Sequence, residues 1–163
     1  MGPALVLAGG QAPPLEWVRP RLERAPWIFC ADSGLRICLQ CDIVPDALIG
    51  DLDSLEVAEV EGLPDLRVGV FRHPVDKDES DLHLTLQRLA QYWQGPVEIL
   101  GALGGRLDHT LFNLCSMLYF AQQLGFDPRV VDPETVVMPL SAELVLDGFA
   151  GHHCSLLPLS EQL

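Results

Sequence analysis

Basic side chains are scarce in this sequence. Its 163 residues contain ten Lys and Arg against 23 Asp and Glu, which gives a formal net charge of −13 at pH 7. Such a chain is repelled by nucleic acid phosphates and by anionic membranes, so we expect neither a nucleic acid nor a membrane partner. A small anionic substrate is compatible with this charge, because a divalent cation held by carboxylates reverses the sign of the local field.

The sequence also lacks long apolar runs, and it lacks the even number of cysteines that a disulfide framework needs. No stretch approaches the roughly 18 apolar residues that a membrane helix needs, and residues 1–10 lack the basic start and the cleavage site of a signal peptide. The five cysteines are odd in number, which suits reduced thiols and a cytoplasmic location. Cys38 and Cys41 form a single C-x-x-C; without a second ligand pair, this spacing favours buried packing over zinc binding.

The length and the apolar content predict one domain with a substantial core, because 48% of the residues are apolar. Apolar runs of strand length alternate with segments of helical period. This is the pattern of an α/β domain whose mainly parallel sheet is flanked by helices. Several runs are apolar on both faces, as strands covered on both sides should be. The predicted strands are residues 4–9, 27–32, 46–51, 66–71, 97–102 and 129–132.

The apolar spacing also predicts four helices. Two of them have a clear apolar face that repeats every three or four residues and docks on the sheet. The other two are shorter, and Pro20 predicts a break or a kink in the first. We expect these helices at residues 14–25, at residues 34–41, from Asp78 to Trp93, and from Leu107 up to Gly125, which ends the last one.

The C-terminal region has a different pattern. Residues 136–163 indicate short β segments, and residues 152–159 look like a strand without a partner. A lone strand would have to pair with a further β region or with another subunit. We therefore expect an α/β domain at residues 1–128, followed by the last strand or strands and the start of an incomplete C-terminal β region at residues 129–163.

Acidic residues follow several predicted strands. The carboxyl ends of parallel strands share one edge of the sheet, and open α/β folds bind their ligands at that edge. The sequence thus predicts an acidic patch in the place where a ligand is expected. Its members are Asp32, Asp51, Asp53, Asp76, Asp78, Asp81 and Asp108.

Two pairs of aspartates within this patch can be interpreted either as metal ligands or as ordinary structural residues. Behind Gly50, an extended backbone would point Asp51 and Asp53 the same way, with α-carbons roughly 6.5 Å apart, so that both reach one cation. The alternative is a solvated Asp-rich turn. Asp78 and Asp81 fit metal ligands at the start of a helix or simple helix capping, which is worth about 0.3–1 kcal/mol each. Capping does not explain why both pairs fall on the same edge.

The Gly-Gly turn before the last helix has the features of a phosphate site. Gly104 and Gly105 permit close backbone approach, the following helix offers free N–H groups, and Arg106 offers a planar cationic fork. Asp108 places a carboxylate within one turn of these donors. His109 fits either a nucleotide contact or an ordinary polar residue of the first helical turn.

Together these groups indicate a site for metal-assisted phosphoryl transfer from a nucleotide. Glycines also close the predicted strand ends at residues 7–10 and 31–34, on the same edge as the acids. The sequence contains no G-x-x-x-x-G-K-[ST] motif, so a P-loop is excluded.

Five motifs follow one another at and near the predicted carboxyl edge. They are LAGG at 7–10, ADSG at 31–34, PDALIGDLDS at 45–54, DKDESD at 76–81 and GGRLDHTLFN at 104–113. In this order and spacing they resemble thiamine pyrophosphokinase over about residues 4–115. The resemblance implies a Rossmann-like catalytic domain that transfers a diphosphate from ATP to the hydroxyl of thiamine. It also implies thiamine diphosphate and AMP as products, Mg²⁺ as the cofactor and a homodimer as the usual assembly.

The resemblance also implies roles for individual residues. The magnesium-centred catalytic acids would be Asp51, Asp53, Asp78, Asp81 and Asp108. The nucleotide side would be formed by Asp32, Gly34, Gly104, Gly105, Arg106, His109 and Asn113. The family adds a smaller β-sandwich domain that helps to form the thiamine pocket at the dimer interface. This chain stops about where that domain would begin, so we expect a complete nucleotide half and an incomplete acceptor half.

Two other functions remain open at this point. The chain could be a nucleotide-binding domain without turnover, or a different metal–nucleotide enzyme such as a D-x-D glycosyltransferase or a diphosphokinase for another alcohol, for example a pterin. The different enzyme is disfavoured because a D-x-D motif alone explains neither residues 76–81 nor residues 104–109. Under every metal-dependent hypothesis, the acids should repel each other and lower the stability when metal is removed.

Overall fold

The computed structural model describes residues 2–61, 63, 67–76, 78–124, 128–140 and 143–158. Within these residues one sheet has the strand order β4-β3-β2-β1-β5-β6-β7, and all neighbours are parallel except β6 and β7. All six predicted strands are therefore confirmed, as is the mainly parallel sheet. The strands are β1 (Ala4–Leu7), β2 (Ile28–Ala31), β3 (Ala47–Gly50), β4 (Gly69–Arg72), β5 (Val97–Leu100), β6 (Pro128–Val131) and β7 (Val136–Val137).

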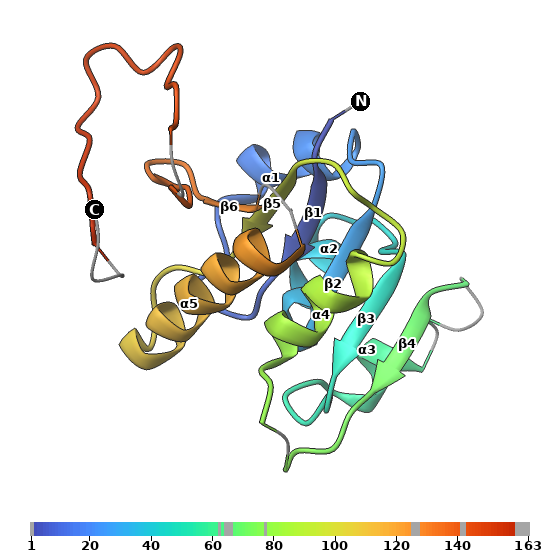
Figure 1. Ribbon diagram of the computed structural model, residues 1–163. Helices are drawn as coiled ribbons and strands as arrows, with labels where there is room; N and C mark the ends of the chain where they lie inside the picture. The colour runs from blue at the N-terminus through green and yellow to red at the C-terminus, as the bar shows by residue number, and fades with distance from the viewer. Residues whose placement is uncertain are drawn as a thin grey trace.

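Helices cover both faces of this sheet, with α4 and α5 on one face and α1 and α2 on the other (Figure 1). Alternate residues of β1 point to opposite faces, as the two-residue period of a strand requires. Leu5 and Leu7 pack in the core beneath α1 and α2, whereas Val6 packs beneath α4 and α5. The helical elements are α1 (Leu15–Leu22), the 3₁₀ turn η1 (Asp32–Gly34), α2 (Leu35–Gln40), α3 (Val57–Val60), α4 (Asp81–Leu89) and α5 (Leu107–Leu124).

Two helix predictions need correction. α4 begins at Asp81 rather than at Asp78, because Ser80 has an extended backbone and its side chain caps the helix by accepting the His83 N–H at 3.1 Å. Asp78 lies before the helix and is exposed. α1 continues through Pro20 to Leu22, so the predicted break does not occur, while the alternative of a kink stays a prediction. Pro20 lies close to the end of this short helix, so the hydrogen bond that it removes disrupts little of it.

The C-terminal prediction is only partly correct. The short strand β7 pairs antiparallel with β6, but none of the described residues between 138 and 158 belongs to a helix or strand. Residues 152–158 therefore form no strand within the chain itself, and their predicted pairing with a further β region or with another subunit stays a prediction. This segment extends away from the sheet (Figure 1), and its side chains are exposed, so it has no strand edge with which to pair. The predicted helix end at Gly125 lies outside the described residues.

None of the helices in the described parts of the chain is both long and apolar enough to cross a bilayer.

Candidate functional site

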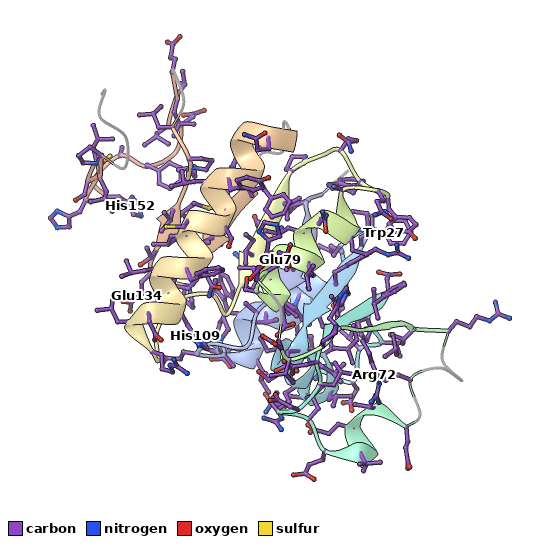
Figure 2. All side chains as sticks on the ribbon, turned by 60° about the horizontal axis from the view of Figure 1, so that its bottom comes forward. Trp27, Arg72, Glu79, His109, Glu134 and His152 are labelled. Carbon is purple, nitrogen blue, oxygen red and sulfur yellow. The ribbon has the colours of Figure 1, made fainter. Side chains whose placement is uncertain are left out.

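The loops that follow β1 and β5 meet at the carboxyl edge of the sheet. β1 lies between β2 and β5, so the strand order changes direction there, which is the position where doubly wound sheets bind ligands. Backbone hydrogen bonds join the two loops, from Ala8 N–H to the Leu100 carbonyl and from Gly10 N–H to the Gly101 carbonyl, both at 2.8 Å. Figure 2 turns this edge of the molecule forward and shows His109 at the start of α5.

Three carboxylates gather beside this point. One ligand oxygen from each of Asp32, Asp51 and Asp53 lies within 4.8 Å of the others, and we call these residues the acid cluster. Asp32 belongs to η1 after β2 and has a positive φ of 46°. Asp51 and Asp53 belong to the loop after β3. Two loops far apart in the sequence thus bring their acids together, as the sequence predicted for the shared edge.

The backbone between Asp51 and Asp53 is not extended, which corrects the geometry expected from the sequence. Leu52 has a φ of 64°, and its side chain is buried in the core beneath α1 and α2. The Asp53 N–H donates a hydrogen bond to the Asp51 carboxylate at 3.1 Å. Burial of Leu52 therefore anchors a tight turn, and this turn, rather than a strand, holds the two acids close.

Asp81 comes to the same place from the start of α4. A Cβ built on Gly50 would lie 3.3 Å from the Asp81 carboxyl carbon and 3.1 Å from the Asp32 Cβ. Gly50 also has a φ of 155°, so a side chain there would be strained as well as crowded. Asp81 therefore lies beside the acid cluster, and Gly50 makes room for both carboxylates.

The electrostatics of the acid cluster favour a cation. The pKa of Asp53 is raised, first by its hydrogen bond with Asp51 and by the charge of Asp51, then by desolvation and by the charges of Asp32 and Asp81. The Asp32 Oδ1 is buried and accepts no hydrogen bond from the described residues. Mg²⁺ prefers hard carboxylate oxygens of this kind, so the residues present fit such an ion.

Besides Asp81, which lies beside it, two other predicted metal ligands lie outside the acid cluster. Asp78 is exposed in the loop before α4. Asp108 pairs with Arg106, which donates from Nε to Oδ1 at 3.1 Å and from its second nitrogen to Oδ2. This pairing lowers the pKa of Asp108. Both residues, like His109, are exposed at the carboxyl edge, so the structure does not join them to the three carboxylates.

The predicted glycines have different surroundings. Gly104 and Gly105 both have positive φ angles, of 77° and 71°. An added Cβ on Gly104 would strike Gln11, whereas one on Gly105 would meet nothing within 4 Å, so the turn presents open backbone at Gly105. Gly34 is buried, and its Cβ would lie 2.0 Å from the Leu7 carbonyl oxygen. Gly34 therefore permits close packing of η1 on β1.

Asn113 supports the Gly-Gly turn from within α5. Its side-chain amide donates to the Ala102 carbonyl at 3.1 Å, and its side chain is half-buried. This contact ties the helix to the loop after β5. In the structure Asn113 therefore orders the loop that carries Gly104 and Gly105.

Sequence reasoning missed two residues near the acid cluster. The Ser54 hydroxyl donates to Asp32 Oδ2, and Arg36 donates to the Ser54 carbonyl at 2.7 Å. Ser54 ends the motif at residues 45–54 and could have been singled out from that position. No pattern in the sequence pointed to Arg36.

The cysteines give no support for the zinc alternative. Cys38 and Cys41 are completely buried, as the packing interpretation expects. Cys38 Sγ lies 3.7 Å from Cys30 Sγ. Among the described His, Cys, Asp and Glu residues, the acid cluster is the group whose ligand atoms lie close enough together to hold a metal ion.

The fold and this site agree with a comparison against protein families. The model of the thiamin pyrophosphokinase catalytic domain matches residues 18–126. The chain belongs to this family. The match includes η1, the turn with Asp51 and Asp53, the start of α4 and the Gly-Gly turn, so it covers the acid cluster and the predicted phosphate site together.

Two curated relatives agree with this assignment. The chain is 29% identical over 112 residues to thiamine pyrophosphokinase of Bacillus subtilis, which covers 69% of this chain and 51% of the relative. It is 27% identical over 170 residues to thiamine pyrophosphokinase 1 of Oryza sativa, which covers 90% of this chain and 62% of the relative. The chain therefore spans between about half and three-fifths of the length of these relatives.

Solved structures show the same fold. The thiamin pyrophosphokinase family protein of Enterococcus faecalis superposes with a TM-score of 0.68 at 26% identity, over 83% of this chain and 63% of that one. Thiamin pyrophosphokinase of Candida albicans superposes with a TM-score of 0.71 at 15% identity, over 82% of this chain and 59% of that one. At this lower identity the likeness concerns the fold alone.

Proposed function

We propose that this chain carries the thiamine pyrophosphokinase reaction, the Mg²⁺-dependent transfer of a diphosphate from ATP to the hydroxyl of thiamine. The products are thiamine diphosphate and AMP. The observation that carries the proposal is the acid cluster of Asp32, Asp51 and Asp53 at the carboxyl edge of the sheet, in a chain of this family.

The proposed magnesium ligands are Asp51, Asp53 and Asp81, together with Asp32, which the family resemblance assigns to the nucleotide side. Their support is the closeness of the three carboxylates, the position of Asp81 beside Gly50 and the Asp32 oxygen that accepts no hydrogen bond from the described residues. When bound, Mg²⁺ neutralises charge on the phosphates and helps to align them. Asp78 retains its predicted role as a further magnesium-centred acid at this edge.

The proposed nucleotide side is the Gly-Gly turn and the start of α5. Gly105 offers open backbone to a phosphate, and the first N–H groups of α5 add donors. Arg106 holds Asp108 through two hydrogen bonds, and a phosphate can accept the same fork in place of the carboxylate. Asp108 would then be released toward the metal, in the role that the family resemblance implies. His109 is exposed at the same end of α5 and serves as a further nucleotide contact.

In this reaction the protein mainly positions its substrates. The thiamine hydroxyl oxygen forms a bond to the β-phosphorus and releases its proton to solvent, while the bond from this phosphorus to the bridging oxygen of AMP breaks and that oxygen leaves with AMP. Catalysis comes from holding the two oxygens in line and from stabilising the charge that develops on the phosphates. The fixed turns at Asp32 and at Leu52 supply that rigidity, because both belong to loops anchored in the core.

Three further properties belong to this proposal. The first is the Rossmann-like organisation, with a catalytic unit at residues 1–128 and an incomplete β region at residues 129–163. The second is a homodimer, which the exposed apolar side chains of the C-terminal segment, such as Leu156 and Leu157, would support. The third is a cytoplasmic location, which the composition predicts.

A nucleotide-binding domain without turnover is the second candidate. The observation that favours it is that the groups identified at the carboxyl edge, the acid cluster and the Gly-Gly turn, all belong to the proposed metal and nucleotide side. The two candidates differ in whether AMP formation depends on thiamine. The experiment incubates the purified chain with ATP and Mg²⁺, with and without thiamine, and measures AMP and thiamine diphosphate. Equal amounts of both products, only when thiamine is present, are expected; ATP binding without these products would favour the second candidate.

Magnesium is expected to stabilise the chain near neutral pH and to lose this effect in acid. Because the pKa of Asp53 is raised, the folded metal-free chain binds this proton more tightly than the unfolded chain. The stability from this group is present below the ordinary Asp pKa and is lost as the pH rises through the raised value. At pH values above the raised pKa of Asp53, bound Mg²⁺ should compensate for this lost stability. Below the ordinary Asp pKa, protons displace the ion from the carboxylates.

At a concentration about 100 times its Kd, Mg²⁺ should raise the melting temperature by about 5–10 °C at about pH 7.5. Thermal unfolding with MgCl₂ or with EDTA, at neutral and at acidic pH, tests this expectation. Equal melting temperatures with MgCl₂ and EDTA at neutral pH would contradict it.

A further inference from the structure

A surface ion pair holds the loop that carries two residues of the acid cluster. Arg36 on α2 donates from Nε to Glu59 Oε1 at 2.9 Å and from Nη2 to Glu59 Oε2 at 3.1 Å. The same Nη2 donates to the Ser54 carbonyl at 2.7 Å. Glu59 in turn accepts the Glu56 N–H at 2.8 Å, which caps α3. We call Arg36 and Glu59 the clamp, because they fix the backbone of Ser54 between two helices.

Ser54 connects the clamp to the acid cluster. While its carbonyl is held by Arg36, its hydroxyl donates to Asp32 Oδ2. Asp32 Oδ1 is left buried and without a hydrogen bond from the described residues. The clamp therefore acts at two points, since it restrains the turn that contains Asp51 and Asp53 and, through the Ser54 hydroxyl, fixes the orientation of the Asp32 carboxylate.

We infer that Arg36 and Glu59 are positioning residues, which hold the acid cluster in the arrangement that binds the divalent cation. The inference rests on the proposed function, because it assumes that the cluster holds such an ion. The clamp opposes the mutual repulsion of the carboxylates, which would otherwise spread the loop when no cation is present. Outer contacts of this kind typically change metal affinity by about 10–100-fold when they are removed.

A purely electrostatic role and a positioning role of Arg36 predict opposite effects of its removal on cation binding. Its guanidinium is a positive charge close enough to Asp32 to interact with it. If Arg36 acted only through its charge, its removal would strengthen the binding of a cation. If it acts as a clamp, its removal weakens that binding although a positive charge has been lost.

The experiment measures Mn²⁺ binding to the purified chain without ATP, through the electron paramagnetic resonance signal of free Mn²⁺. Arg36→Ala and Ser54→Ala are each expected to raise the Kd about tenfold. Arg36→Lys keeps the charge but cannot make all three contacts, so it should have an intermediate Kd. The control is Arg21→Ala, which removes a half-buried arginine of α1 paired with Glu98 at 4.0 Å and should leave the Kd unchanged.

An unchanged or lower Kd in Arg36→Ala would overturn the inference, as would wild-type chain that binds no Mn²⁺. Far-UV circular dichroism and melting temperature verify that each variant is folded. If Arg36→Ala did not fold, the Kd of Ser54→Ala would test the inference instead, and an unchanged or lower Kd in that variant would overturn it. If wild-type chain bound Mn²⁺ but made no thiamine-dependent AMP, the proposed function would fail, while the clamp would still be judged by the Kd values.

Discussion

Replacing both Asp51 and Asp53 with alanine is expected to lower thiamine-dependent AMP formation by about 10³-fold or more. The two carboxylates lie within 4.8 Å of Asp32, and their loss would remove most of the proposed magnesium site. Phosphate alignment and charge stabilisation would then fail together, and the loss of either one typically costs about 10²-fold. The measurement is the initial rate of AMP formation at saturating ATP and thiamine, over a range of Mg²⁺ concentrations.

The same double variant should be more stable than wild type when metal is absent, because the repulsion that raises the pKa of Asp53 is removed. Higher stability together with lost activity would show that the double variant has lost the metal site but keeps its fold. Asp147→Ala is the matched control, since it removes one exposed carboxylate from the C-terminal segment and should retain full activity. A double variant with more than about a tenth of the wild-type rate would exclude these residues as metal ligands.

Gly34→Ala is expected to destabilise the fold strongly. The new Cβ would lie 2.0 Å from the Leu7 carbonyl oxygen and 2.6 Å from its carbon, and these backbone atoms belong to the central strand β1. Neither β1 nor η1 can move aside without disturbing the core, so we expect a loss of about 3 kcal/mol. For a chain of this length, that loss lowers the melting temperature by roughly 6–12 °C.

The same change should also reduce Mn²⁺ binding, because any shift of η1 moves Asp32, which begins that turn. Gly2→Ala is the control, since its Cβ would make only an ordinary contact of 3.8 Å with the Arg24 carbonyl. Thermal unfolding of both variants tests the prediction. A Gly34→Ala melting temperature within about 2 °C of wild type would show that β1 and η1 yield easily at this contact.

The sheet and the position of the site could be predicted from the sequence because both follow from short-range patterns. Strands buried on both faces are continuous apolar runs, and acids directly after such runs must gather at one edge of a parallel sheet. Asp32, Asp51 and Asp53 were found in this way. Their roles as ligands remain a proposal, whereas their closeness is a property of the fold.

The parts that could not be predicted depend on contacts between side chains from different elements. The left-handed turn at Leu52 exists because this side chain enters the core, which no local pattern reveals. The apolar spacing alone extends α4 back to Asp78, whereas the contact by which Ser80 caps the helix sets its start at Asp81. The contacts of Ser54 and Arg36 join residues 18 and 22 positions apart. Residues 152–158 have the composition of a strand but no adjacent edge, and only the fold could show this.

The most direct test of the central claim is to follow ATP that carries ³²P in its β-phosphate. The complete chain is incubated with this ATP, Mg²⁺ and thiamine, and the products are separated by chromatography. The account predicts that the label appears in thiamine diphosphate, in an amount equal to the AMP formed, and that this label is lost in the Asp51→Ala, Asp53→Ala double variant. Label found only in ADP, inorganic phosphate or pyrophosphate, with none attached to thiamine, would contradict diphosphate transfer by this chain.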